Sequence, residues 1–139
     1  MYQEHILAKS MTEARKGSIQ VGNILVDEDM KEMAELESTI FLSREAGEPA
    51  LLRLISLVET RNSGQIAKIA RFLAGLYNGY AYPFDLTDLR CVDQLILNDC
   101  LLVLRMDATP EREVHQYIEN GQVRWQEMIE RFGIKPVIR

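Results

Sequence analysis

Three aspartates in one short stretch are the residues whose spacing best suits chemistry. Asp85 and Asp88 stand three positions apart, and Asp93 follows five positions later. Side chains at i and i+3 share one face of a helix, so the first two carboxylates could converge on a divalent cation or exchange a proton. The same residues suit helix capping, since aspartate accepts hydrogen bonds from the free N–H groups of a first turn. The leucines around them favour capping, with Asp85 and Asp88 on one turn and Asp93 on the next.

Histidine and cysteine supply the other reactive side chains. His115 lies among glutamates and arginine, which is typical of a solvated side chain and not of a general base. No serine stands in a tight glycine turn, so there is no nucleophile elbow. His5 and His115 lie far apart in the sequence, and Cys91 and Cys100 lie nine positions apart, unlike the ligands of a zinc site. Only folding could bring Cys91, Cys100 and His115 together. The sequence therefore predicts two reduced, buried thiols, no metal ion, no cofactor and no enzyme activity.

An aromatic loop is the first of two features that could bind a partner protein. Tyr80, Tyr82 and Phe84 stand close together around Pro83. Tyrosine is common at interfaces because it buries a large ring and keeps a polar tip. The loop could instead fold inward and close one end of a helical bundle. The sequence favours this core role slightly over the interface role.

An acidic run is the second such feature. Its carboxylates are Asp27, Glu28, Asp29, Glu32, Glu35 and Glu37. They could present a negative face to a basic protein, with Asp27, Asp29 and Glu32 as contacts, or imitate the phosphates of a nucleic acid. Acidic residues also suit the first turn of a helix, where they oppose the helix dipole, followed by a solvated face. The sequence favours this structural interpretation.

Hydrophobic periodicity predicts the helices that must position these residues. Residues 2–16 suit a first helix, and residues 18–26 suit a short β-hairpin or an extended arm. Gly47 is a plausible helix stop and Pro49 a plausible restart. The further helices are expected over 27–46, 49–61, 65–78, 94–106, 110–120 and 123–132, with a short helical turn at 86–89.

The fold class expected from this pattern is all-α. Residues 94–106 are apolar around nearly their whole circumference, which is typical of a helix at the centre of its domain. We therefore expect a compact bundle of about five helices around this segment. The residues expected in the core are Leu54, Ile55, Ile66, Ile69, Leu73, Leu97, Leu101, Leu104 and Trp125.

Charge divides the chain into two parts. Residues 1–46 carry five basic and nine acidic side chains, a net charge of −4, whereas residues 47–139 carry eleven basic and twelve acidic ones, a net charge of −1. The first part is also poorer in bulky apolar residues. We interpret residues 1–46 as an acidic N-terminal arm that packs on the helical core domain of residues 47–139 or on another chain.

Composition limits the class of protein. A chain of 139 residues with a net charge of −5 is the size of one soluble domain, and its acidity disfavours direct nucleic-acid binding. It has neither a membrane-spanning apolar run nor a secretory signal, so we expect a cytoplasmic protein with no membrane association. Gly75 and Gly79 lie within and after a helix, so they do not form a phosphate-binding loop.

One group of motifs resembles a known family. The motifs are Gly64-Gln65 through Phe72-Leu73, Asn78-Gly79, Phe84-Asp85-Leu86-Thr87-Asp88-Leu89, Val92-Asp93 and Asn98-Asp99. The stretch from about Leu51 to Asp107 resembles a family of small uncharacterised bacterial proteins, many associated with plasmids, phages and integrating elements. The resemblance implies a bacterial source and a mobile-element context, and it brings no known activity or catalytic residue.

These observations favour a non-enzymatic protein that acts by protein–protein interaction, in a regulatory or accessory role. One alternative is an acidic inhibitor of a host defence or DNA-binding protein. The other is an enzyme that assembles Asp85, Asp88, Asp93 and His115 into one site. We also expect a homodimer, because the arm and the aromatic loop hold more apolar surface than so small a chain can cover.

Overall fold

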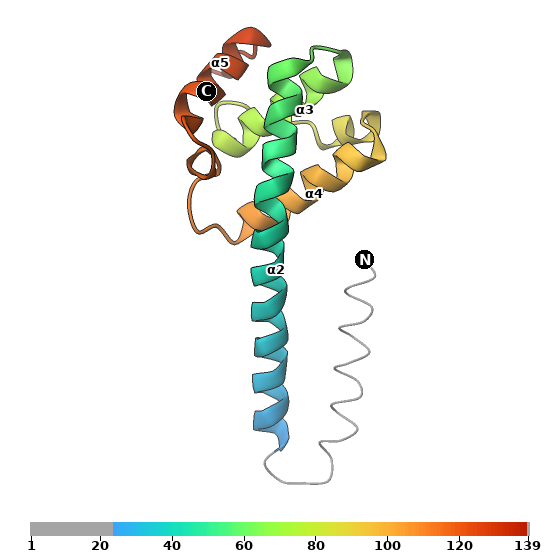
Figure 1. The fold of residues 1–139 in the computed structure, drawn as a ribbon, viewed down its shortest axis with the longest axis vertical. Helices are drawn as coiled ribbons and strands as arrows, with labels where there is room; N and C mark the ends of the chain where they lie inside the picture. Colours follow the sequence, from blue (N-terminus) through green and yellow to red (C-terminus); the bar gives the residue numbers. More distant parts are fainter. Residues whose placement is uncertain (1–23, 139) are drawn as a thin grey trace. The chain divides into compact units, whose positions relative to one another are not determined.

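The computed structural model describes the backbone of residues 24–138 and the side chains of residues 27–138. This part of the chain is helical and contains no strand, so the all-α expectation is confirmed for it (Figure 1). Its elements are α2 (Ile24–Thr60), α3 (Gly64–Tyr77), the 3-10 helix η1 (Leu86–Cys91), α4 (Gln94–Ala108), the 3-10 helix η2 (Val114–Tyr117) and α5 (Gly121–Arg131). The expected helix over 2–16 and most of the hairpin stretch lie outside the described residues. Residues 24–26 belong to α2.

The chain divides into two compact units between Leu42 and Ser43. The N-terminal unit is described here by residues 24–42, the first part of α2. The C-terminal unit holds the rest of α2 and all later elements.

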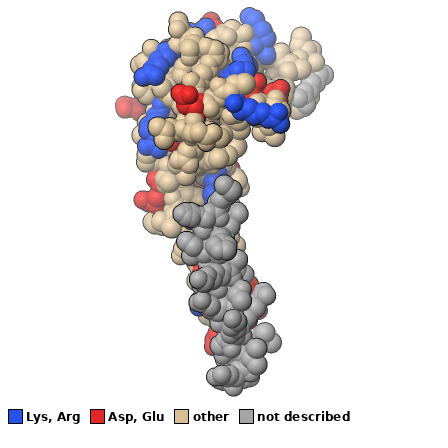
Figure 2. Space-filling model, turned by 90° about the vertical axis from the view of Figure 1, so that its right-hand side faces the viewer, with Lys and Arg blue, Asp and Glu red and all other residues tan. Residues whose placement is uncertain are grey.

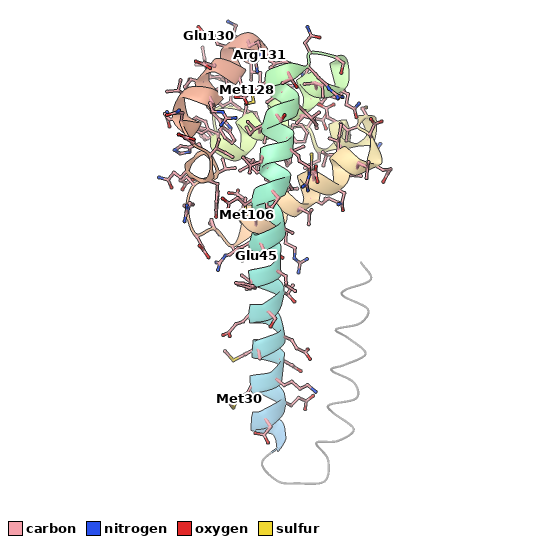
Figure 3. All side chains as sticks on the ribbon, viewed as in Figure 1. Met30, Glu45, Met106, Met128, Glu130 and Arg131 are labelled. Carbon is pink, nitrogen blue, oxygen red and sulfur yellow. The ribbon has the colours of Figure 1, made fainter. Side chains whose placement is uncertain are left out.

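Helix α2 continues through both predicted breaker residues. Gly47 and Pro49 lie inside it, so the predicted stop and restart are wrong. Gly47 is buried against α4, where a Cβ atom would lie only 2.5 Å from the Cβ atom of Met106 (Figure 3). The glycine is therefore needed for the close approach of two helices, and tertiary packing outweighs its weak helix propensity.

The core of the C-terminal unit is built mainly from α2, α3 and α5, with contributions from α4 and η2. Trp125 of α5 is fully buried, and its indole Nε1–H donates a 2.9 Å hydrogen bond to the carbonyl oxygen of Leu73 in α3. Other large, fully buried side chains include Leu51, Leu54, Ile55, Val58, Ile66, Ile69, Met106, Met128, Val103 and Val114. Six of the nine expected core residues are buried, all of them on α2, α3 and α5.

Helix α4 is not the centre of the bundle, which corrects the prediction for residues 94–106. It buries Cys100, Val103 and Met106, whereas Leu95 is 82% exposed and Leu101 50% exposed. The expected core residues Leu97 and Leu104 are only half-buried. Apolar residues around a whole helix indicate burial only when neighbours surround it, and α4 packs on one side.

The segment after α4 is not the predicted helix over 110–120. Thr109 ends α4, and only η2 is helical before α5 begins. The Arg44 guanidinium holds this turn, because its Nε and Nη2 atoms donate to the Thr109 carbonyl oxygen at 3.1 and 2.9 Å. The left-handed backbone of Asn120, with φ of 55°, then turns the chain into α5.

Candidate interaction surfaces

Asp85 caps a helix, as the sequence predicted. Its Oδ1 atom accepts hydrogen bonds from the backbone N–H of Thr87 at 2.9 Å and from the Thr87 hydroxyl at 2.7 Å. The Thr87 side-chain bond, followed by the backbone bond, holds the pKa of the Asp85 carboxyl below its usual value. The Asp85 carboxylate therefore serves as the N-cap of η1.

Asp88 and Asp93 do not cap helices with their side chains, which corrects the capping prediction for both. Asp88 pairs with two cations of α3, lying 3.1 Å from Lys68 Nζ and 3.7 Å from Arg71 Nη2. Asp93 occupies the N-cap position of α4, but its Oδ2 atom accepts a 3.3 Å hydrogen bond from Gln65 Nε2. Its backbone N–H also donates to the Gln65 side-chain oxygen. The two carboxylates therefore fasten η1 and the start of α4 to α3.

His115 packs at the end of α3 opposite to the residue that binds Asp93. Its ring packs edge-on against Tyr77 at 5.2 Å, at the last residue of α3. Gln65, the partner of Asp93, lies twelve residues earlier in the same helix, and this spacing corresponds to about 18 Å along the axis. Within residues 27–138, no three His, Cys, Asp or Glu side chains gather where they could hold a metal ion.

The two thiols differ in their surroundings. Cys91 is exposed, so the expectation of two buried thiols is wrong for this residue. Cys100 is buried in α4, and burial raises its thiol pKa to about 12.

The aromatic loop folds largely onto α3. Phe84 packs edge-on against Phe72 with ring centroids 5.5 Å apart, and Tyr82 and Phe84 are half-buried against the core. A Cβ atom at Gly75 would lie 3.1 Å from the Tyr82 carbonyl oxygen, which shows how closely the loop approaches the helix. Tyr80 is 66% exposed. Tyr82 and Phe84 therefore have the core role that the sequence favoured. Of the three aromatic residues, Tyr80 alone is largely exposed.

The acidic run lies within α2. The helix begins at Ile24, so Asp27 stands in its first turn and is not the predicted N-cap. Asp27 and Asp29 are exposed, and Glu32 is half-buried. Residues 24–42 hold six acidic side chains and one basic one, Lys31, a net charge of −5.

The same part of α2 carries an exposed apolar stripe, formed by Met30, Met33, Ala34 and Phe41. Met30, Met33 and Phe41 are 64%, 61% and 60% exposed, and Figure 3 shows Met30 on this part of α2. Their spacing places them on one face of the helix, with Glu37 among them. A shallow hollow of about 500 Å³ beside the stripe is lined by Ala34, Glu37, Ser38, Phe41 and Leu42. The helical spacing of this stripe is visible in the sequence, but its exposure is not.

A second hollow lies in the C-terminal unit and was not predicted from the sequence. It holds about 350 Å³ and is lined by Arg71, Tyr82, Pro83, Phe132, Gly133, Ile134, Lys135 and Val137. These residues come from α3, the aromatic loop and the segment after α5. No local sequence signal joins three such distant segments.

Charge in the C-terminal unit is mixed. Residues 43–139 carry twelve basic and thirteen acidic side chains, and Figure 2 shows both signs interspersed on the face of this unit that it presents. Within residues 24–138, each helix is too short or too polar to cross a membrane.

Comparison with known proteins identifies a family but no function. No curated protein and no solved structure matches the chain. Residues 48–133 match a family of unknown function (DUF7673), in agreement with the expectation of an uncharacterised family. This match spans most of the chain, and it begins within α2 and ends just after α5. The protein therefore belongs to this family of unknown function, DUF7673.

Proposed function

We propose that this protein acts by binding another protein through the apolar stripe of its N-terminal unit. The observation that carries the proposal is the exposure of Met30, Met33 and Phe41 on one face of an acidic helix. Contiguous apolar surface of this kind is typical of interaction sites. Methionine suits such a site, because its unbranched side chain adapts to the shape of a partner.

The charge around the stripe favours a basic partner. Asp27 and Asp29 are exposed, and Glu37 lines the hollow beside Phe41. A helix with apolar residues on one face and lysine or arginine beside them would cover the stripe and neutralise these carboxylates. The partner is therefore a basic amphipathic helix. A DNA-binding protein that presents such a helix would suit the alternative role of acidic inhibitor.

A second copy of the chain is the competing occupant, and this is the homodimer expected from the sequence. Pairing two such helices would bring together two segments that each carry a net charge of −5. Their repulsion is screened by salt, so added salt should strengthen a homodimer formed through the stripe. Added salt should weaken the binding of a basic helix. Light scattering and partner titration at low and high salt thus distinguish the two occupants.

The test uses a fluorescent amphipathic peptide of leucine and lysine, about 20 residues long so that it can form a helix. Binding to the full chain is followed by fluorescence anisotropy. Phe41→Ser should weaken binding by about tenfold, because it removes a large exposed contact from the stripe. The matched control is Leu95→Ser, which removes another exposed apolar side chain, from the C-terminal unit.

A peptide of leucine and glutamate with the same pattern should not bind. Equal binding of the basic peptide to wild type and to Phe41→Ser would overturn the proposed site. Tighter binding at high salt would contradict the role of the acidic side chains. The bacterial, cytoplasmic and mobile-element setting stays a prediction, as does the alternative of an Asp/His enzyme. Of its residues, Asp93 and His115 contact opposite ends of α3.

A further inference from the structure

The hollow in the C-terminal unit is formed where three segments meet. Arg71 lies on α3, Tyr82 and Pro83 belong to the aromatic loop, and residues 132–137 follow α5. Its volume of about 350 Å³ falls within the range of small-molecule sites in proteins. All of its lining residues belong to one compact unit.

Backbone hydrogen bonds fix the wall that follows α5. Gly133 adopts a left-handed conformation with φ of 63°, which glycine tolerates, and it ends the helix. The N–H groups of Gly133 and Ile134 donate to the carbonyl oxygens of Glu130 and Ile129 at 3.1 and 3.0 Å. Further along, the N–H of Val137 donates a 2.8 Å hydrogen bond to the Ala81 carbonyl oxygen. The segment is thereby held against the aromatic loop.

The charged side chains that line the hollow are both cations, Arg71 and Lys135. The Arg71 guanidinium lies 3.7 Å from Asp88, whose closer partner is Lys68 at 3.1 Å. Within residues 27–138, the Arg71 guanidinium makes no hydrogen bond and Lys135 makes no ion pair. The Tyr82 hydroxyl likewise has no hydrogen-bond partner among the described residues. Among the described residues, Lys135 and the Tyr82 hydroxyl can therefore donate to an anion, and Arg71 can do so with the N–H groups that its ion pair with Asp88 does not use.

The rest of the lining is apolar and includes the ring of Phe132 and the side chains of Pro83, Ile134 and Val137. Such a surface suits a flat hydrocarbon body, and the planar guanidinium of Arg71 suits the two oxygens of a carboxylate. We infer that this hollow binds a small aromatic carboxylate, with the ring against the apolar wall and the carboxylate near Arg71 and Lys135. The inference is independent of the protein-binding stripe.

The probe for this site is 2-naphthoate, and the uncharged comparison is 2-naphthamide, which has nearly the same shape. Both are titrated into the full chain and followed by the backbone amide signals of Ile134 and Val137 in NMR spectra. Naphthoate should bind and naphthamide should bind more weakly. Lys135→Gln should weaken naphthoate binding about three- to tenfold, because a charge-assisted contact is lost. Arg61→Gln is the matched control, since Arg61 is exposed and does not line the hollow.

A second variant, Arg71→Gln, should weaken naphthoate binding at least as strongly, with a circular dichroism melt confirming that it folds. Equal shifts with naphthoate and naphthamide, or no shifts with naphthoate up to about 5 mM, would overturn the inference. If Arg61→Gln lost as much affinity for naphthoate, the losses in the other two variants would reflect general charge attraction. That result would also overturn the inference. Phe41→Ser should leave naphthoate binding unchanged, so this site and the stripe can fail separately.

Discussion

Replacing Gly47 by alanine tests the close contact between α2 and α4 in the C-terminal unit. The added Cβ atom would lie 2.5 Å from the Cβ atom of Met106, 2.8 Å from its Sδ and 3.0 Å from its Cγ. A rotamer change can move the sulfur, but it cannot move a Cβ atom. Helices α2 and α4 must therefore shift apart to accept the substitution.

Two opposing effects set the magnitude. Alanine is a better helix former than glycine by up to about 1 kcal/mol in a helix interior. Forcing an extra methyl group into a packed contact costs typically ~1–3 kcal/mol. Because the clash involves a Cβ atom, we expect the packing cost to exceed the propensity gain. Gly47→Ala should lower the free energy of unfolding by about 1–2 kcal/mol.

The assay is urea denaturation followed by circular dichroism, with Gly64→Ala as the matched control. Gly64 begins α3, and a Cβ atom there would meet nothing within 4 Å. This control should therefore be neutral or stabilising by up to about 1 kcal/mol. If Gly47→Ala proved as stable as wild type or more stable, the close crossing of α2 and α4 at this residue would be refuted.

Three further predictions concern titratable groups. A thiol reagent should modify Cys91 in the native protein and Cys100 only after unfolding. The reason is that Cys91 is exposed, whereas Cys100 is buried and its pKa is about 12. A DTNB assay should therefore show one thiol that reacts fast and one that reacts slowly. The hydrogen-bonded pair of Glu59 with Arg124 holds the pKa of Glu59 below its ordinary value of 4.5, so its stabilisation is present above about pH 4.5 and lost as the pH falls through the lower, folded-state pKa. Glu59→Gln should accordingly reduce stability at pH 7 by less than about 1 kcal/mol and have little effect at pH 3 in urea titrations. Burial raises the pKa of the Asp107 carboxyl, so its ionised form destabilises the fold, the opposite of Glu59. Asp107→Asn should therefore raise stability at pH 7 by less than about 1 kcal/mol, with a smaller gain in acid.

Local signals predicted helix α3 and its neighbourhood well. Ile66, Ile69 and Leu73 are spaced for one helical face, and all three are buried in the structure. Asp85 caps η1 by accepting a hydrogen bond from the backbone N–H of Thr87, two residues later. Such features depend on contacts within a few positions, so the sequence contains nearly all the information about them.

The candidate surfaces could be predicted only in part. The acidic run and the helical spacing of Met30, Met33 and Phe41 are readable from the sequence, whereas their exposure depends on what packs against α2. The hollow lined by Arg71 and Lys135 joins residues more than sixty positions apart. Its position depends on the contact of the segment after α5 with the aromatic loop, which no local motif predicts.

The sequence by itself determined the helical class of the described residues, the amphipathic face of α3 and the concentration of negative charge in residues 24–42. The tertiary structure alone decided that Gly47 would lie inside a helix and that α4 would leave Leu95 exposed. Periodicity shows which side chains share a face, and composition shows where charge gathers. Burial depends on which distant surfaces meet, and glycine can either end a helix or admit a neighbouring one. At Gly47 the packing of α4 against α2 decides between these two outcomes, and no local sequence pattern contains that information.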